Sequence, residues 1–432
     1  MRWPLLLALI LATCAGCANT PATTAATTAA PASAAATSAA PAVGATSDRP
    51  LVILVSIDGF RPDYLDRGDT PTLAALAGAG VRAKSMQPAF PTLTFPNHYT
   101  LVTGLYPDHH GIINNRFRDP VSGAAFVFKD RDTTADPSWW GGEPIWITAQ
   151  KQGLRTATMF WPGSDVAITG VRPDHWLYFD GSMTSDERVD HLLQWIDLPA
   201  ARRPQFYTLY FDTVDHASHS HGPQSREVDA ALREVDAAIA RLVAGLRQRD
   251  LYRHTDLVIV SDHGGAQTSK ALRTYLDEVV PLDDVKVDNY GVLATLSPRP
   301  GKTASVERAL LKPHPHMQCW RKAQLPARLH YGSNPRLPAI VCVANTGGVI
   351  TDRAYEQKRR FFSAGEHGYD NADPQMQALF IAHGPDFRSG LVVDAFPNVD
   401  VYPLLAHLLR ITPAANDGDF ATVAPMLRDA RR

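Results

Sequence analysis

The stretch LVILVSIDG, residues 51–59, is an unbroken apolar run rich in β-branched residues, and it ends in Asp-Gly. Residues 206–215 (FYTLYFDTVD) and 256–265 (DLVIVSDHGG) repeat this plan, and residues 378–387 (ALFIAHGPDF) look like a further run of the same kind. A strand that is buried on both faces of a mostly parallel sheet has such a continuous apolar sequence. The four stretches therefore predict buried strands of one central sheet.

Helical patterns lie between these strands. Residues 225–250 carry apolar residues three or four positions apart, which form one stripe along a helix. The members of this stripe are Val228, Leu232, Val235, Ile239, Leu242 and Leu246. Strands that alternate with such helices indicate an α/β fold, in which helices flank a central, mostly parallel sheet.

Residues 280–355 interrupt this alternation with Pro- and Gly-rich pieces and short strand-like runs. We interpret them as a smaller insertion region that covers an edge of the sheet or a site. Residues 49–279 and 356–432 are then the two parts of one α/β domain. The sequence does not fix where the insertion begins and ends.

The overall composition is that of an ordinary globular protein. The chain has 432 residues, of which 45% are hydrophobic and 20% charged, and its formal net charge is -2. With so little net charge we expect no binding to nucleic-acid duplexes, and an anionic substrate must be attracted by a local site. The composition predicts no particular oligomeric state.

The N-terminus predicts an exported protein. Residues 1–17 resemble a signal peptide, because Arg2 precedes an apolar run over 5–12 that is too short to span a membrane. Residues 18–48, rich in Ala, Thr, Pro and Ser, have the composition of a flexible linker. Cys17 follows Ala-Gly as in a lipoprotein processing site, so the alternatives are a lipid anchor at Cys17 or cleavage and release. Both alternatives predict a periplasmic location.

Two cysteines, Cys319 and Cys342, lie beyond the signal region. In an oxidising compartment they could form a disulfide. They lie far in sequence from the acidic and histidine motifs described next, which argues against a role in a metal site.

Each of the first three predicted strands delivers an aspartate at or just past its carboxyl end, namely Asp58, Asp215 and Asp262. In open α/β sheets ligands bind in the crevice outside these ends, so we expect the three carboxylates to converge. A single aspartate after a strand more often stabilises a turn. Three of them, accompanied by histidines, favour a functional site.

Histidines accompany these aspartates. His263 directly follows the third aspartate, and His219 stands four residues after the second, on the same face if that segment is helical. His367 lies in GEHGYDN with glycines on both sides. Imidazole and carboxylate together suit zinc or a similar divalent ion. His216 and His221 flank His219, and spacing alone does not choose among the three.

Two threonines, Thr92 and Thr94, stand in PTLTFPNHYTLVTG, residues 91–104, just before a run with a helical pattern. The usual role of threonine at such a place is to cap the free N–H groups of the helix. The alternative is a nucleophilic hydroxyl next to a metal site. Local sequence leaves both open.

Six motifs carry a resemblance to a known family, namely SIDGFRPDYL, PTLTFPNHYTLVTGLYPDHHGI, WPGSDV, VDHASHSHGP, VIVSDHGG and GEHGYDN. On these motifs the chain resembles the nucleotide pyrophosphatase/phosphodiesterase family of the alkaline phosphatase superfamily, as an exported bacterial member. The resemblance runs in order from about residue 51 to 371 and is less clear in the insertion region. It implies an alkaline-phosphatase-like catalytic domain with two zinc ions.

The resemblance also implies roles for residues. The nucleophile, the threonine before Phe-Pro-Asn, matches Thr94, and Thr92 is then a scaffold residue. One zinc ion is held by Asp58, Thr94, Asp262 and His263. The other is held by Asp215, His219 and His367. The family's H-x-x-G-P ending matches the sequence at His219, which favours it over its two histidine neighbours.

Substrate contacts follow from the same resemblance. The asparagine that holds a phosphate oxygen matches Asn115 in GIINNRF, and Asn114 is the weaker match. Phe95 matches an aromatic residue that stacks on a nucleobase. Tyr178 is similar to its partner on the other face of the base, and Tyr210 to a further tyrosine of the pocket. The alternative is that these aromatic residues fill the core.

The neutral Asn115 favours a phosphodiester substrate, because the extra charge of a monoester calls for a cationic donor such as arginine. Arg116 and Arg118 are close enough in sequence to supply that donor instead.

We therefore interpret the chain as a two-zinc phosphodiesterase and nucleotide pyrophosphatase. Metal coordination lowers the pKa of a threonine hydroxyl, so Thr94 could attack phosphorus and form a phospho-enzyme intermediate. The substrate would be a nucleotide or another phosphodiester, and the product a nucleoside 5'-monophosphate. The alternatives are a lysophospholipase-C-like or glycerophosphodiester hydrolase, and a phosphomonoesterase on the same scaffold. A non-catalytic metal-dependent binding module would leave Thr94 without a role.

Overall fold

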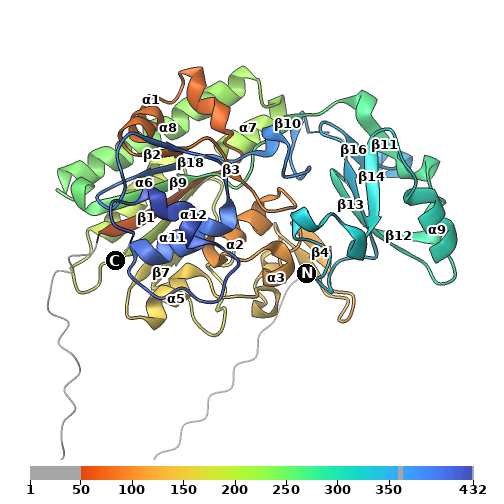
Figure 1. Cartoon of the computed structure of the whole chain (residues 1–432), viewed down its shortest axis with the longest axis horizontal. Coiled ribbons are helices and arrows are strands. Elements are labelled where there is room, and N and C mark those ends of the chain that lie inside the picture. The colour runs from red at the N-terminus through yellow and green to blue at the C-terminus, as the bar shows by residue number, and fades with distance from the viewer. Residues whose placement is uncertain (1–49, 359–362, 431–432) are drawn as a thin grey trace, which may run out of the picture. The chain divides into compact units, whose positions relative to one another are not determined.

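An eight-stranded sheet forms the centre of the fold (Figure 1), in a computed structural model that describes residues 50–358 and 363–430. The strand order is β19-β2-β18-β9-β1-β8-β6-β7. The strands are β1 (Leu51–Ile57), β2 (Val81–Ala83), β6 (Thr156–Met159), β7 (His175–Leu177), β8 (Phe206–Phe211), β9 (Thr255–Val260), β18 (Phe380–His383) and β19 (Leu391–Val393). The four predicted strands are confirmed, and they are the four neighbours β18, β9, β1 and β8.

Most neighbouring strands run parallel, as the sequence predicts. β1 pairs in parallel with both β8 and β9, and β6 continues the parallel arrangement to β7. β18 is the exception, because it runs antiparallel to β9 on one side and to β2 on the other. A continuous apolar run is the same in either direction, so this reversal has no signal in the sequence.

Helices cover both faces of the sheet (Figure 1). The longer helices are α1 (Pro71–Ala79), α2 (Thr94–Thr103), α5 (Ile145–Lys151), α6 (Ser185–Ile196), α7 (Thr213–His221), α8 (Arg226–Gln248), α9 (Thr303–Leu310) and α11 (Val401–Leu408). The shorter ones are α3 (Pro107–His110), α4 (Arg131–Thr134), α10 (Arg353–Lys358) and α12 (Phe420–Val423). On β1, Val52 and Leu54 pack in the core formed with α2, α5 and α11, whereas Ile53 and Val55 pack in the core formed with α1, α6 and α8. The fold is therefore a three-layer α/β fold.

The predicted helix over 225–250 is confirmed as α8, and its apolar stripe is buried against the sheet. Ser225 caps its first turn by accepting a hydrogen bond from the backbone N–H of Val228. Asp236 on α8 in turn accepts hydrogen bonds from the backbone N–H groups of Thr72 and Leu73, at 3.0 and 2.8 Å. These bonds tie α8 to the start of α1.

A second sheet, four-stranded and antiparallel, lies within the predicted insertion region. In spatial order its strands are β12 (Val285–Asn289), β13 (Leu293–Pro298), β15 (Ile340–Ala344) and β14 (Met317–Arg321). Cys319 and Cys342 are paired residues on β14 and β15 and form a disulfide, which confirms the predicted pairing. The Tyr331 hydroxyl donates to the Ile113 carbonyl at 2.8 Å, so this region contacts the segment that leads to Asn115. The boundaries of the region stay predictions.

The predicted signal peptide, the linker and Cys17 lie outside the described residues. Export, the periplasmic location and the fate of Cys17 therefore stay predictions of the sequence. Within residues 50–358 and 363–430, no helix combines the length and apolar composition needed to cross a membrane.

Candidate active site

Three aspartates converge at the carboxyl ends of neighbouring strands. Asp58 directly follows β1, Asp262 lies just beyond β9, and Asp215 lies in the first turn of α7, which follows β8. Gly59 allows this close approach. It has a φ of 69° and donates its N–H to Asp262 Oδ1 at 3.2 Å, and a Cβ atom on it would lie 3.1 Å from Asp215.

The inner cluster, as we call it, consists of Asp58, Thr94, Asp262 and His263. His263 Nε2 lies 2.9 Å from Asp262 Oδ2 and 3.6 Å from Asp58 Oδ1. The same atom lies 3.4 Å from Thr94 Oγ1. His263 Nδ1 lies 2.9 Å from the Gly264 carbonyl oxygen and donates to it, so Nε2 faces the carboxylates with its lone pair. Two carboxylates, an imidazole and a hydroxyl thus meet at one point.

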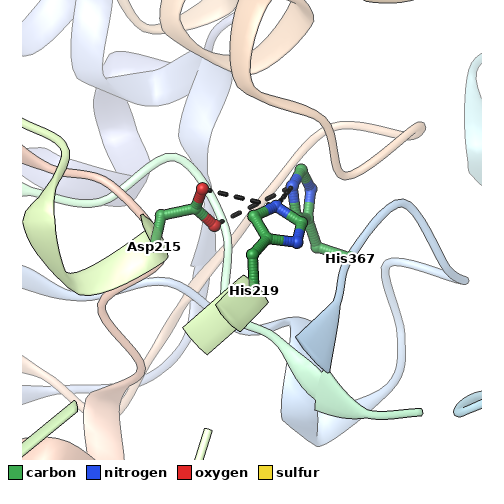
Figure 2. Close-up of side chains that lie close together, drawn as sticks. All are labelled: Asp215, His219 and His367. Atoms are coloured by element: carbon green, nitrogen blue, oxygen red, sulfur yellow. Dashed lines mark hydrogen bonds and ion pairs between the residues drawn. The ribbon is translucent and has the colours of Figure 1, made fainter. Parts of the chain in front are cut away.

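The outer cluster consists of Asp215, His219 and His367, whose side chains point toward one another (Figure 2). His219 Nε2 lies 3.4 Å from Asp215 Oδ2 and 3.2 Å from His367 Nε2. His219 Nδ1 lies 2.8 Å from the carbonyl oxygen of Gly365, which is the first residue of β17 (Gly365–Glu366). That contact fixes the ring with Nε2 toward the cluster, as metal-binding histidines require.

The two other histidines of α7 lie elsewhere. The side chain of His216 is 75% exposed and lies 3.6 Å from Asp212 Oδ2. His221 is exposed. Spacing in the sequence left three histidines of α7 as candidates. Of these, His219 is the one that lies beside Asp215 and His367.

The inner and outer clusters adjoin each other. The rings of His263 and His367 stack with their centroids 3.6 Å apart. Ligand atoms of Asp58, Asp215 and His263 all lie within 4.8 Å of one another, although they come from different clusters. Two cations bound side by side, roughly 4 Å apart, would suit this arrangement.

The electrostatics of the inner cluster call for bound cations. Burial raises the pKa of Asp58 well above its usual value, and the carboxylates of Asp262 and Asp215 raise it further. Although burial lowers the pKa of His263, Asp262 raises it overall, so a proton and a cation compete for the same place. Among the described residues, Asp58 Oδ1 and Asp262 Oδ2 are buried without a hydrogen-bond partner. Orphaned carboxylate oxygens beside imidazole lone pairs fit a divalent ion such as zinc.

The outer cluster differs from the inner one in its protonation state and in its exposure to solvent. Burial, with the nearby His263, lowers the pKa of His367 to about 3, so this ring is neutral and its Nε2 lone pair is free. Asp215 and His219 are partly exposed, with 20% and 28% of their side-chain surface accessible. The outer cluster therefore also fits a divalent ion, but one within reach of water.

Thr94 is the first residue of α2. The residue at the N-cap is Leu93, whose side chain makes no capping hydrogen bond. The capping alternative is therefore not realised by Thr94, whose hydroxyl instead faces the inner cluster. The N-terminal turn of α2 also directs its dipole toward this point.

The two candidate asparagines have different contacts. Asn115 Oδ1 accepts a hydrogen bond from the backbone N–H of Phe95 at 2.9 Å, which places the asparagine beside the start of α2. Asn114 Oδ1 accepts from the backbone N–H of Arg116 within its own turn. Arg118 donates to the carbonyl oxygen of Gly123 within the hairpin formed by β4 (Arg116–Arg118) and β5 (Ala125–Val127).

Phe95 and Tyr210, two of the predicted substrate-binding aromatics, adjoin the clusters. Phe95 is partly buried, and its ring packs against those of Phe128 at 5.6 Å and Trp140 at 6.3 Å. Tyr210 is buried, and its hydroxyl donates to Asp58 Oδ2 at 2.6 Å. Tyr210 thus supports a carboxylate of the inner cluster, a contact that the sequence did not predict.

Tyr178 and its neighbour Phe179 differ in what covers them. The guanidinium of Arg131 lies 3.4 Å from the centre of the Tyr178 ring. Phe179, which the sequence analysis did not single out, is 52% exposed, and its ring lies 6.0 Å from that of Tyr210. Consecutive residues of an extended chain point to opposite sides, and this alternation is the signal that could have separated them.

The fold and the two clusters define an α/β protein of the alkaline-phosphatase type with a candidate two-metal centre. The chain belongs to the type I phosphodiesterase / nucleotide pyrophosphatase family, which matches residues 52–370. The resemblance found in the sequence is thereby confirmed at the level of the family.

Three relatives illustrate the similarity. Human ectonucleotide pyrophosphatase/phosphodiesterase family member 1 is 40% identical over 394 residues, which make up 88% of this chain and 42% of the human protein. An uncharacterized pyrophosphatase/phosphodiesterase of Schizosaccharomyces pombe is 36% identical over 88% of this chain and 80% of its own length. The structure of murine ectonucleotide pyrophosphatase/phosphodiesterase 5, an inactive threonine-to-alanine variant in complex with AMP, is 33% identical with a TM-score of 0.83, and the match covers 88% of this chain and 100% of that one. The chain spans less than half of the length of the human relative.

Proposed function

We propose that this chain is a zinc-dependent phosphodiesterase that hydrolyses phosphodiester or pyrophosphate bonds of nucleotides. The observation that carries the proposal is the position of Thr94, whose hydroxyl caps no helix and lies 3.4 Å from His263 Nε2 within the inner cluster. A nucleophile is the role that this uncommitted hydroxyl can fill. The similarity to a murine relative in complex with AMP supports a nucleotide as the substrate and disfavours a lysophospholipid.

Zinc ions held by the inner and outer clusters would lower the pKa of the Thr94 hydroxyl and of a water molecule, and would offset the negative charge of the phosphate. Thr94 Oγ1 attacks phosphorus, the bond to the leaving group breaks, and the leaving oxygen takes up a proton. Water then cleaves the threonine–phosphate ester and releases a nucleoside 5'-monophosphate. The buried carboxylates of the inner cluster are held in place by hydrogen bonds from the Gly59 N–H and the Tyr210 hydroxyl.

Asn115 is proposed to hold a non-bridging phosphate oxygen. Its Oδ1 atom is already bonded to the Phe95 N–H, so its amide NH₂ group is the part left to donate. An amide carries no charge, and a diester has fewer charged oxygens than a monoester. The proposed site therefore prefers diesters.

A comparison of two substrates tests this proposal. The purified, zinc-loaded enzyme is assayed with a nucleotidyl aryl diester and with the aryl monoester that has the same leaving group. We expect a higher kcat/KM for the diester, by at least about tenfold. Equal or faster hydrolysis of the monoester would make the site a phosphomonoesterase and would overturn the proposed function.

Phe179 is proposed as the aromatic residue that stacks on the nucleobase opposite Phe95. The structural reason is that Phe179 is exposed beside Tyr210, whereas one face of the Tyr178 ring is covered by Arg131. Stacking on an aromatic ring contributes about 1–3 kcal/mol per base, so Phe179→Leu should raise KM for a nucleotide diester by about tenfold. The matched control is Tyr178→Leu, for which we expect a change of less than about threefold. A larger effect in the Tyr178 variant would return the stacking role to Tyr178, as the sequence predicts.

A further inference from the structure

His98 is a buried histidine to which the proposed mechanism gives no role. It lies one turn after Thr94 on α2, is 0% exposed, and packs edge-on against the rings of Trp161 and Tyr210. Its Nδ1 atom lies 2.9 Å from the Thr94 carbonyl oxygen and 3.4 Å from Asp262 Oδ2. One ring thus contacts both the backbone of the proposed nucleophile and a carboxylate of the inner cluster.

The contacts of His98 select one neutral tautomer. The Thr94 carbonyl oxygen can only accept, so the proton is on Nδ1 and points toward that oxygen and the Asp262 carboxylate. Nε2 then accepts the hydroxyl proton of Ser56, whose Oγ atom lies 2.8 Å away on β1. A nitrogen that donates to a carbonyl cannot bind a cation at the same time. His98 therefore supports the inner cluster and is not one of its ligands.

Thr92 makes corresponding contacts toward the outer cluster. Its hydroxyl accepts the N–H of Gly368 at 2.9 Å and donates to the Tyr369 carbonyl at 3.1 Å. Its own carbonyl oxygen lies 2.8 Å from His367 Nδ1 and accepts that proton. His367 is thereby held with Nε2 toward the outer cluster.

We propose that residues 92–98, which we call the nucleophile segment, support both metal half-sites, that is, the inner and the outer cluster, from the two sides of Thr94. His98 is the positioning residue for the inner cluster, and Thr92 is the positioning residue for the outer cluster. The proposal rests on the proposed function, because it takes two bound zinc ions as given. Its consequence is that Thr94 keeps a fixed position relative to both ions, since one short segment holds all three.

The test measures zinc affinity at one half-site at a time. His219→Ala removes a ligand of the outer cluster and leaves the inner site, and His263→Ala does the reverse. Into each background we introduce His98→Phe, which removes the contacts of the imidazole nitrogens, or Thr92→Val. The valine variant keeps the backbone carbonyl that accepts from His367 and removes the hydroxyl whose bonds to Gly368 and Tyr369 hold the two segments together. Zinc affinity is measured by competition with a chromophoric chelator, and the unfolding midpoint of each metal-free variant is measured alongside.

We expect a crossed pattern. In the His219→Ala background, His98→Phe should lower the zinc affinity of the remaining inner site by about 10–100-fold. Thr92→Val should change that affinity by less than about threefold. In the His263→Ala background, the order of the two effects should be reversed. His98→Asn, which keeps a donor near the position of Nδ1, and Thr92→Ser, which keeps the hydroxyl, should each restore most of the affinity.

Several outcomes would overturn the proposal. Equal weakening of both half-sites by one substitution would show a general loss of packing, and unchanged affinities would show that the segment supports neither ion. If His98→Phe fails to fold, His98→Asn is compared with His98→Gln, whose donor lies near Nε2 instead. Equal zinc affinities of these two variants would then count against the proposal. Two bound zinc ions without diester hydrolysis in the wild-type protein would overturn the proposed function alone.

Discussion

Strand β9 carries a buried aspartate at each end, and the two carboxyl groups have opposite electrostatics. Asp256 is the second residue of the strand, Asp262 follows its last residue by two, and both are 0% exposed. Burial, with the Asp386 carboxylate, raises the pKa of Asp256 to about 7. Burial acts in the same direction on Asp262, but the nearby His263 and His98 hold its pKa below the ordinary value.

The depth of burial is therefore not what separates a structural acid from a candidate metal ligand. Both residues have a buried Oδ2 atom without a hydrogen-bond partner among the described residues. At Asp256 the physical response is a raised pKa, so the carboxyl group is neutral below about pH 7. At Asp262 the imidazoles favour the ionised form, and the orphaned oxygen is available to a cation. The neighbours supplied by other segments decide the role.

The largest expected effect concerns the carboxyl end of β9, where the Thr94 hydroxyl lies 3.4 Å from Nε2 of His263, the residue after Asp262. Thr94→Ala should lower kcat/KM for a nucleotide diester by at least ~10³-fold, because no other group replaces the nucleophile. Zinc content, measured by atomic emission, should remain near that of the wild type, since the carboxylate and imidazole ligands are unchanged. Thr94→Ser should retain part of the rate. An alanine variant with near wild-type turnover would remove Thr94 from the proposed role.

The same substitution at both ends of β9 tests the comparison directly. Asp262→Asn should lose one zinc ion and reduce kcat/KM by about 10²-fold or more, because the inner cluster loses a charged ligand. Asp256→Asn, the matched control on the same strand, should keep both zinc ions and change activity by less than about twofold. Comparable losses of zinc in the two variants would contradict the distinction between the two edges.

The smallest expected effect concerns the free energy of unfolding and depends on Asp256, near the amino end of β9. The folded-state pKa of Asp256 is about 7, above that of an unfolded chain, so its contribution to stability is present at low pH and is lost as pH rises toward and past 7. Asparagine does not titrate, so Asp256→Asn should gain about 2–3 kcal/mol relative to wild type between pH 5 and pH 8. Urea unfolding of both proteins at the two pH values measures this gain. A stability difference that does not change with pH would contradict the assignment.

The sequence predicts much of the site at the carboxyl ends of the strands, because each strand and the candidate ligand that follows it are contiguous in the chain. An apolar run followed by Asp-Gly or Asp-His specifies a buried strand and the side chain at its end, which is how Asp58 and Asp262 could be identified. The order of the sheet also places the four apolar runs together, since long buried strands occupy its centre.

The remainder depends on contacts between distant segments, which a periodic pattern does not encode. Ser56 and His98 look like ordinary polar residues in sequence, and only the packing of α2 on β1 brings them within 2.8 Å. Tyr210 was expected at the substrate, and its bond to Asp58 depends on the register of β1 with β8. The short strands β2 and β19 have too few residues for an alternation pattern to be read.

The antiparallel strand β18 has a consequence for biosynthesis. It lies between β9 and β2, and Ile381 pairs with Arg82 on one side and with Ile259 on the other. β18 is translated after both of these neighbours, so the sheet cannot be completed until this strand is available. Until then the facing edges of β9 and β2 present unpaired amide groups, the kind of edge on which chains aggregate.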